Sequence, residues 1–156
     1  MADVSDYTSG KILTQAKLAL YLLKFVTIPI VGKLIAKKLS GEIKSFEPKL
    51  IDIETASAII QGSEKCAVGE RVCRAIHNKS KLTESVFLDE LAEELVNIKK
   101  AEFVSKIEAI ERLKKYKSPI ILSKVSRNNM EICCSIPSDC VYWNFEKRGI
   151  KCLLKE

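Results

Sequence analysis

Two predicted strands near the C-terminus decide the fold: Ile120-Ile121-Leu122-Ser123-Lys124-Val125 and Met130-Glu131-Ile132-Cys133-Cys134-Ser135-Ile136. The polar run 126–129 between them is typical of a turn, so we expect a β-hairpin. Side chains alternate between the two faces of a strand. Cys134 is therefore expected on one face with Ile132, and Cys133 on the other face with Glu131. A single metal centre can readily take only one of these two cysteines, and we favour Cys134.

The six cysteines of this 156-residue chain are its strongest chemical signal. Four lie in the last 24 residues, and the other two lie well upstream in Cys66-Ala-Val-Gly-Glu-Arg-Val-Cys73. The acidic N-terminus, with Asp3 and Asp6, does not resemble a secretory signal, so we expect a cytoplasmic protein. A reducing compartment disfavours structural disulfides. Metal ligation, redox chemistry and ordinary burial of free thiols remain as explanations.

The spacing of the upstream pair favours an iron–sulfur cluster over a single ion. On a regular helix, Cys66 and Cys73 would share a face but lie about 10 Å apart along the axis. One tetrahedral zinc ion cannot easily hold both thiolates, whereas a cluster keeps its ligands farther apart. We therefore predict a 4Fe-4S cluster whose ligands come from the following set, with Cys133 as the alternative to Cys134: Cys66, Cys73, Cys134, Cys140 and Cys152.

Two other interpretations of the thiols stay open. The first is a structural zinc site that mediates assembly, with His77, four residues after Cys73, as a further candidate ligand. The second is a thiol switch or metal carrier that uses the Cys133-Cys134 doublet. The chain has no C-x-x-C motif, so it matches neither ferredoxin-type nor zinc-ribbon spacing. It also has no P-loop, G-x-S-x-G or H-E-x-x-H motif, and we expect no independent catalytic constellation.

The cysteine pattern also carries a resemblance. The segments Ile132-Cys133-Cys134-Ser135, Cys140-Val141-Tyr142-Trp143-Asn144 and Cys152, with Cys66 to Cys73 upstream, are similar to cysteine-rich proteins of methanogenic archaea, over most of the chain. The resemblance implies an anaerobic setting and no particular activity. Together with the predicted cluster, it leads us to expect electron transfer, or a small or accessory subunit of an anaerobic redox complex.

The positive charge is concentrated near the N-terminus. The net charge is +6, and residues 11–40 contain six lysines and no acid. Apolar residues at helical spacing predict helices over 11–26 and 30–39, interrupted by Pro29. No uncharged run approaches the roughly 20 residues that a membrane span requires. Lysine in place of arginine disfavours sequence-specific nucleic-acid recognition. We expect residues 1–47 to form a basic amphipathic arm that packs on its own domain, docks on a larger redox protein or lies on a membrane surface.

The remaining patterns predict helices over 52–61, 83–100 and 105–116, and another helix that begins at residue 66. They also predict a second hairpin over 140–154. We therefore expect an α+β protein with a helical N-terminal two-thirds and a small antiparallel C-terminal sheet that carries most of the cysteines. The predicted domains are the arm, 1–47, and a cysteine-containing domain, 48–156.

Overall fold

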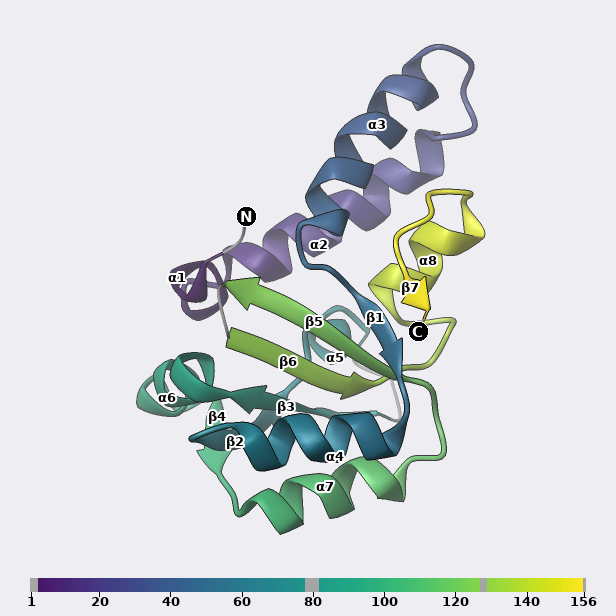
Figure 1. Cartoon of the computed structure of the whole chain (residues 1–156). Coiled ribbons are helices and arrows are strands. Elements are labelled where there is room, and N and C mark those ends of the chain that lie inside the picture. Colours follow the sequence, from purple (N-terminus) through teal and green to yellow (C-terminus); the bar gives the residue numbers. More distant parts are fainter. Residues whose placement is uncertain (1–2, 78–81, 127–128, 156) are drawn as a thin grey trace.

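The structure, a computed structural model, describes residues 3–77, 82–126 and 129–155. Within these ranges the centre of the molecule is a seven-stranded sheet with the order β4-β2-β3-β6-β5-β1-β7 (Figure 1). Neighbouring strands are antiparallel, except that β7 pairs in parallel with β1. The strands are β1 (Lys49–Ile51), β2 (Cys66–Glu70), β3 (Glu84–Leu88), β4 (Ala101–Phe103), β5 (Ile120–Ser126), β6 (Asn129–Cys134) and β7 (Leu154–Lys155).

Helices cover both faces of this sheet. Their bounds are α1 (Val4–Thr8), α2 (Lys11–Leu22), the 3-10 helix η1 (Leu23–Phe25), α3 (Val31–Lys44), α4 (Ile53–Gly62), α5 (Val72–Ile76), α6 (Asp89–Asn97), α7 (Lys106–Lys115) and α8 (Val141–Lys147). Helices α4 and α7 lie side by side on one face (Figure 1). Helices α1 and α6 pack on the opposite face, where Tyr7 and Leu91 join Phe87 of β3.

The predicted β5–β6 hairpin is confirmed, with Ile120 opposite Cys134 and Ile121 opposite Cys133. Alternation along β6 is confirmed as well. Ile132 and Cys134 enter the core beneath α4 and α7, whereas Cys133 packs with Ile121 on the opposite face. The two faces of this hairpin therefore separate the adjacent cysteines.

Two predicted helices are also confirmed together with their N-caps. The side chain of Asp52 accepts a hydrogen bond from the Thr55 N–H at the start of α4. Ser105 accepts one from the Glu108 N–H at the start of α7. These side chains satisfy amide groups that the first turn of a helix leaves without partners.

The predicted fold class is wrong, because strands and helices alternate along the chain. Strands β1 to β4 all lie between residues 49 and 103, in the part expected to be helical. The physical reason is burial on both faces of the sheet. Val86, Phe87 and Leu88 of β3 are all buried, so this strand lacks the alternation that distinguishes strands from helices. Residues 66–70 form strand β2 for the same reason, rather than the start of a helix.

The predicted second hairpin over 140–154 is wrong as well. Residues Val141–Lys147 form helix α8, in which Val141 and Phe145 are buried four residues apart on one side. The aromatic residues between them favoured a strand in the sequence. Packing of the helix against Leu23 and Leu39 decides otherwise, because it buries this apolar side in one cluster.

Helices α2 and α3, joined through η1, form a hairpin that projects beyond the sheet (Figure 1). Leu23, Leu39 and Ile43 pack its base against Phe145 of α8. The predicted domain boundary at residue 47 falls between α3 and β1. No helix in the described part of the chain is both long and apolar enough to cross a membrane.

Gly69 provides a test of the register between β2 and the edge strand β4. It pairs with Ala101, and a Cβ at residue 69 would lie 2.4 Å from the backbone oxygen of Lys100. We expect Gly69→Ala to lower the free energy of unfolding by about 1–3 kcal/mol, because the strands must move apart. Urea denaturation measures this change. Gly62→Ala in α4 is the matched control, since no atom lies within 4 Å of the added Cβ. Equal stability of the two variants would contradict the tight pairing.

Candidate functional site

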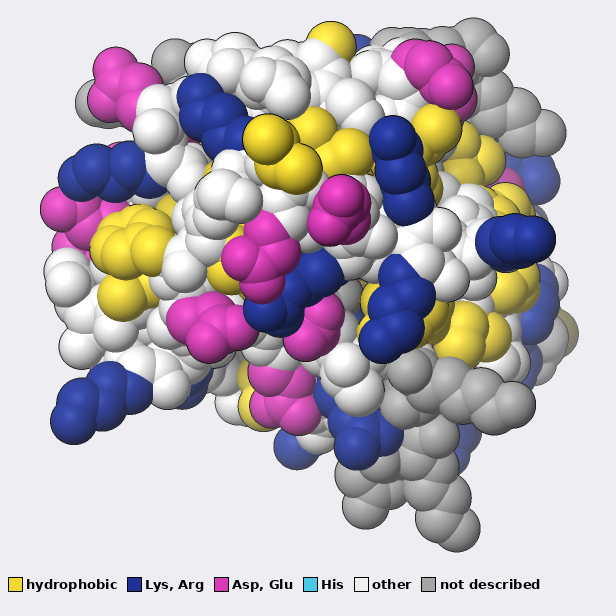
Figure 2. All heavy atoms as spheres, turned by 90° about the horizontal axis from the view of Figure 1, so that it is seen from below, with side chains coloured by type: hydrophobic (Ala, Val, Ile, Leu, Met, Phe, Trp, Pro, Cys, Tyr) yellow, Lys and Arg dark blue, Asp and Glu magenta, His cyan; other side chains and the backbone are white. Residues whose placement is uncertain are grey.

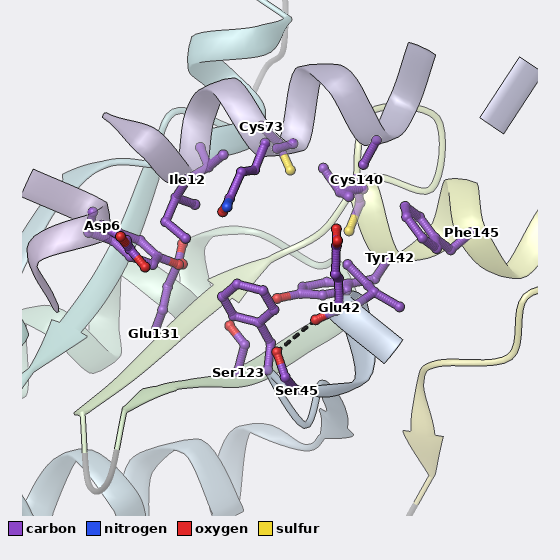
Figure 3. A pocket seen from close by; sticks show the side chains of 18 of the residues that line it. Asp6, Ile12, Glu42, Ser45, Cys73, Ser123, Glu131, Cys140, Tyr142 and Phe145 are labelled. Atoms are coloured by element: carbon purple, nitrogen blue, oxygen red, sulfur yellow. Dashed lines mark hydrogen bonds between the residues drawn. The ribbon is translucent and has the colours of Figure 1, made fainter. Parts of the chain in front are cut away.

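A cavity of about 410 Å³ lies between the sheet and the α2–α3 hairpin. Its sheet side carries Ser123 of β5 with Glu131 and Cys133 of β6, which share one face through the pairing of Ser123 with Glu131. Helices α2 and α3 contribute mainly apolar or small residues to the opposite wall. Figure 3 shows Cys73 and Cys140 on one side of this cavity, with Asp6 at the other end. The volume is sufficient for a small organic molecule.

Arg71 is a buried cation in the wall of this cavity. It follows β2 directly, and only 1% of its surface is exposed. Its Nη1 donates a 2.7 Å hydrogen bond to the carbonyl of Cys134. Its Nε and Nη2 have no hydrogen-bond partner among the described residues, and none of the ion pairs in these ranges involves it. A buried charge of this kind requires a nearby anion.

The thiolate of Cys73 is the anion that the structure provides. Cys73 lies two residues after Arg71, in α5, and lines the cavity together with Cys140, the N-cap residue of α8. A hydrogen bond from Cys140, the charge of Arg71 and the backbone N–H of Val141 together lower the pKa of Cys73 to about 6, against the opposing effect of burial. The same hydrogen bond and burial raise the pKa of Cys140 well above its usual value. The pair therefore holds one thiolate and one thiol at neutral pH.

The other four cysteines all have raised pKa values, and burial is the main cause in each. For Cys134 the pKa rises to about 11 and for Cys152 to about 12. Cys66 and Cys134 also donate their S–H groups to backbone carbonyls of Val104 and Leu113, at 3.2 and 3.4 Å. Only Cys73 is activated as a nucleophile.

A polar group closes the sheet side of the cavity. The carboxylate of Glu131, which is 6% exposed, accepts hydrogen bonds from the hydroxyls of Tyr7 at 2.6 Å and Ser85 at 2.7 Å. Burial and the charge of Glu131 raise the pKa of Tyr7, and burial raises the pKa of Tyr142 against an opposing effect of Ser123. Both tyrosines stay neutral, and the single O–H of Tyr7 is already donated to Glu131.

The structure brings together three of the candidate ligands and separates the others. Cys73, Cys133 and Cys140 line the cavity. Cys66 and Cys134 lie in the core beneath α4 and α7. Following the register from β2 through β3 to β6, those two are about 13 Å apart along the strands and about 10 Å apart across them. Cys152 packs near α8, where its S–H donates to the carbonyl of Tyr142 at 3.6 Å.

These positions do not form a shared ligand set. Among the described residues, no three His, Cys, Asp or Glu side chains converge in a way that could hold a metal ion. His77 caps the C-terminal end of α5, its Nε2 is buried without a partner in the described ranges, and it does not line the cavity. The iron–sulfur cluster and the zinc alternative stay predictions.

Sequence reasoning identified the two central cysteines but not the charged and hydroxyl groups around them. Arg71 and Glu131 were missed because each reads as a solvated charge within a polar segment. One available signal is that Arg71 is the first arginine in the chain and stands two residues before a cysteine. Comparisons with protein-family models, curated proteins and solved structures found no match. The function is therefore argued from the site alone.

The lowered pKa of Cys73 predicts a pH profile for its alkylation. In the wild type, the rate of iodoacetamide modification at Cys73 should rise with a midpoint near pH 6, because only the thiolate reacts. Cys140→Ala removes the hydrogen-bond donor and Arg71→Met removes the positive charge. Both substitutions should move the midpoint toward the usual thiol pKa of about 8.5. Mass spectrometry of the peptide that contains Cys73 measures the rate. An unchanged midpoint in both variants would contradict the assigned causes.

Proposed function

We propose that this protein is a thiol–disulfide redox protein in which Cys73 is the nucleophile and Cys140 the resolving thiol. The observation that carries the proposal is that Cys73, whose pKa is lowered, and a second thiol, Cys140, line the same cavity of ligand size. Low pKa and access to a partner thiol are the features that distinguish reactive from structural cysteines. Geometry thus supports the thiol-switch alternative, with Cys73 and Cys140 in place of the Cys133-Cys134 doublet.

The reaction takes two exchange steps. The Cys73 thiolate attacks one sulfur of a substrate disulfide, which forms a mixed disulfide and releases the first substrate thiolate. Cys140 then loses its proton to solvent or to that thiolate, and attacks the sulfur of Cys73. The mixed disulfide breaks, the second substrate thiolate leaves, and a Cys73–Cys140 disulfide forms. Two electrons pass from the dithiol to the substrate disulfide, which becomes two thiols.

The substrate class follows from the charge of the cavity. Arg71 places a buried positive charge in the cavity wall, and a carboxylate is a group that such a guanidinium attracts. Apolar side chains such as Ile12, Val141 and Phe145 surround the rest of the space. We therefore propose a small disulfide, or its thiol, that carries a carboxylate on a short aliphatic chain.

The same proposal covers location and partners. All six cysteines are free thiols in this structure, which fits a reducing compartment, and we place the protein in the cytoplasm. A reductant with its own low-potential dithiol must restore the reduced state after each turnover. This requirement is compatible with an accessory role beside a larger anaerobic redox complex. Electrons would then pass two at a time through thiol–disulfide exchange.

Two small disulfides of similar size and opposite charge test the function and the substrate class together. Reduced protein should react faster with 3,3′-dithiodipropionate than with cystamine by about tenfold or more, because hydrogen bonds to charged groups are worth about 1.5–3 kcal/mol. Arg71→Met lowers both rates through the pKa of Cys73 but should abolish the preference. The ratio of the two rates, followed by mass spectrometry, isolates the recognition effect from the pKa effect.

Variants of the two cysteines test the order of events. Cys140→Ser should accumulate a mixed disulfide on Cys73, whereas the wild type should form the internal disulfide and lose two free thiols. Cys73→Ser should do neither, and Cys152→Ser should behave like the wild type because that thiol lies outside the cavity. Stoichiometric iron or zinc in anaerobically purified protein that is lost in Cys73→Ser would assign this thiol to a metal and overturn the proposal.

A further inference from the structure

The end of the α2–α3 hairpin carries a group of exposed apolar side chains. Ile30 is 77% exposed and Leu34 is 68% exposed, although their residue types normally bury. On the inner side of the hairpin, Leu23, Leu39 and neighbouring apolar residues are already buried. Packing within the domain therefore does not explain the apolar side chains on the outer side. The exposed group consists of Leu18, Tyr21, Ile28, Ile30, Val31 and Leu34.

The backbone holds one of these side chains at the tip at an energetic cost. Ile30 has φ 66° and ψ −64°, a conformation that β-branched residues rarely adopt. The Val31 N–H donates to the Pro29 carbonyl at 2.8 Å and closes a three-residue γ-turn. Gly32 is required beside it, because a Cβ there would lie 2.1 Å from the oxygen of Val26. Strain of this kind is characteristic of functional positions.

Lysines surround this apolar group without any acidic residue. Residues 11–41 contain six lysines and no Asp or Glu. Five of these lysines are exposed on the outer part of the hairpin: Lys17, Lys24, Lys33, Lys37 and Lys38. The opposite side of the molecule differs. There, Arg112 of α7 pairs with Glu84, Glu102 and Glu108, and charges of both signs are interspersed (Figure 2).

The composition favours a lipid surface over a protein partner. Protein interfaces are depleted in lysine and enriched in arginine, and residues 11–44 contain no arginine. A second copy of the chain would bring like charges together. Tyr21 is 55% exposed, and the Nζ of Lys24 lies 5.6 Å from the centre of its ring. Aromatic and lysine side chains at the edge of an apolar group are typical of the membrane–water interface.

We propose that the tip of the α2–α3 hairpin docks on the surface of an anionic lipid bilayer. Ile30, Val31 and Leu34 enter the boundary between headgroups and acyl chains, and the surrounding lysines contact lipid phosphates. The hairpin is anchored without spanning the bilayer, in agreement with the lack of a spanning helix in the described residues. This inference does not depend on the proposed redox function.

Sedimentation with vesicles tests the docking. The full chain should bind vesicles of phosphatidylcholine and phosphatidylglycerol but not vesicles of phosphatidylcholine alone, and 0.5 M NaCl should weaken the binding. The triple variant Lys33→Gln, Lys37→Gln, Lys38→Gln should partition on the order of a hundredfold less. Ile30→Ser with Leu34→Ser should lose about a hundredfold or more without a change in charge. Ile107→Ser, at a 67% exposed position on α7, is the matched control and should bind like the wild type.

A second measurement establishes which part of the protein enters the membrane. A tryptophan introduced by Ile30→Trp should be quenched by brominated lipid, whereas one introduced by Ile107→Trp should not. Equal binding to neutral and anionic vesicles, or equal quenching at the two positions, would overturn the proposal. Failure to bind anionic vesicles would also overturn it and leave an acidic protein surface as the occupant of the tip.

Discussion

The buried guanidinium of Arg71 determines how the site is organised. Its charge cannot remain in the interior without compensation, because desolvation of an ion costs several kcal/mol even after relaxation. The Cys73 thiolate and the Cys134 carbonyl supply that compensation, so Arg71 connects the end of β2, the start of α5 and the end of β6. Oxidation of Cys73 to a disulfide removes the negative charge but not the positive one. An anionic ligand therefore stabilises the oxidised state most. The carboxylate-bearing thiol that the proposed reaction leaves in the cavity is such a ligand.

The two faces of the sheet explain why six cysteines do not act together. Adjacent residues in β6 point to opposite sides, so Cys133 belongs to the cavity and Cys134 to the core beneath α4 and α7. Cys66 in β2 is on the face of Cys134, whereas Cys73, beyond the end of that strand, is in the cavity wall. The upstream Cys73 does converge with the C-terminal Cys133 and Cys140 at the cavity, and Cys73 and Cys140 form the pair in which one thiol is activated. A pair supports two-electron thiol chemistry more directly than it supports a four-ligand cluster.

The sequence was informative where local interactions decide the structure. Asp52 and Ser105 predicted two helix starts, and alternation in 130–136 predicted both the hairpin and the opposite orientations of Cys133 and Cys134. The interior of the sheet was not predictable by the same rules. Val86, Phe87 and Leu88 are buried on both sides by helices from distant parts of the chain, both before and after this strand, and Val141 is held in α8 by packing against the N-terminal helices. The placement of Cys73 and Cys140 in the wall of one cavity depends on that same tertiary packing, so no spacing rule could reveal it.

The α2–α3 hairpin links the two parts of the molecule to which we assign functions. Ala16 and Ala19 of α2, with Leu39 and Ile43 of α3, form part of the cavity wall. The same two helices continue outward to the strained turn at Ile30 and the exposed lysines. Because the side chains of Ala16 and Ala19 are small, few side-chain atoms separate α2 from Cys73 and Cys140. Any change in the angle between hairpin and sheet must therefore change the width of the cavity. The cavity wall and the exposed tip are thus two parts of the same pair of helices, whose base packs against α8.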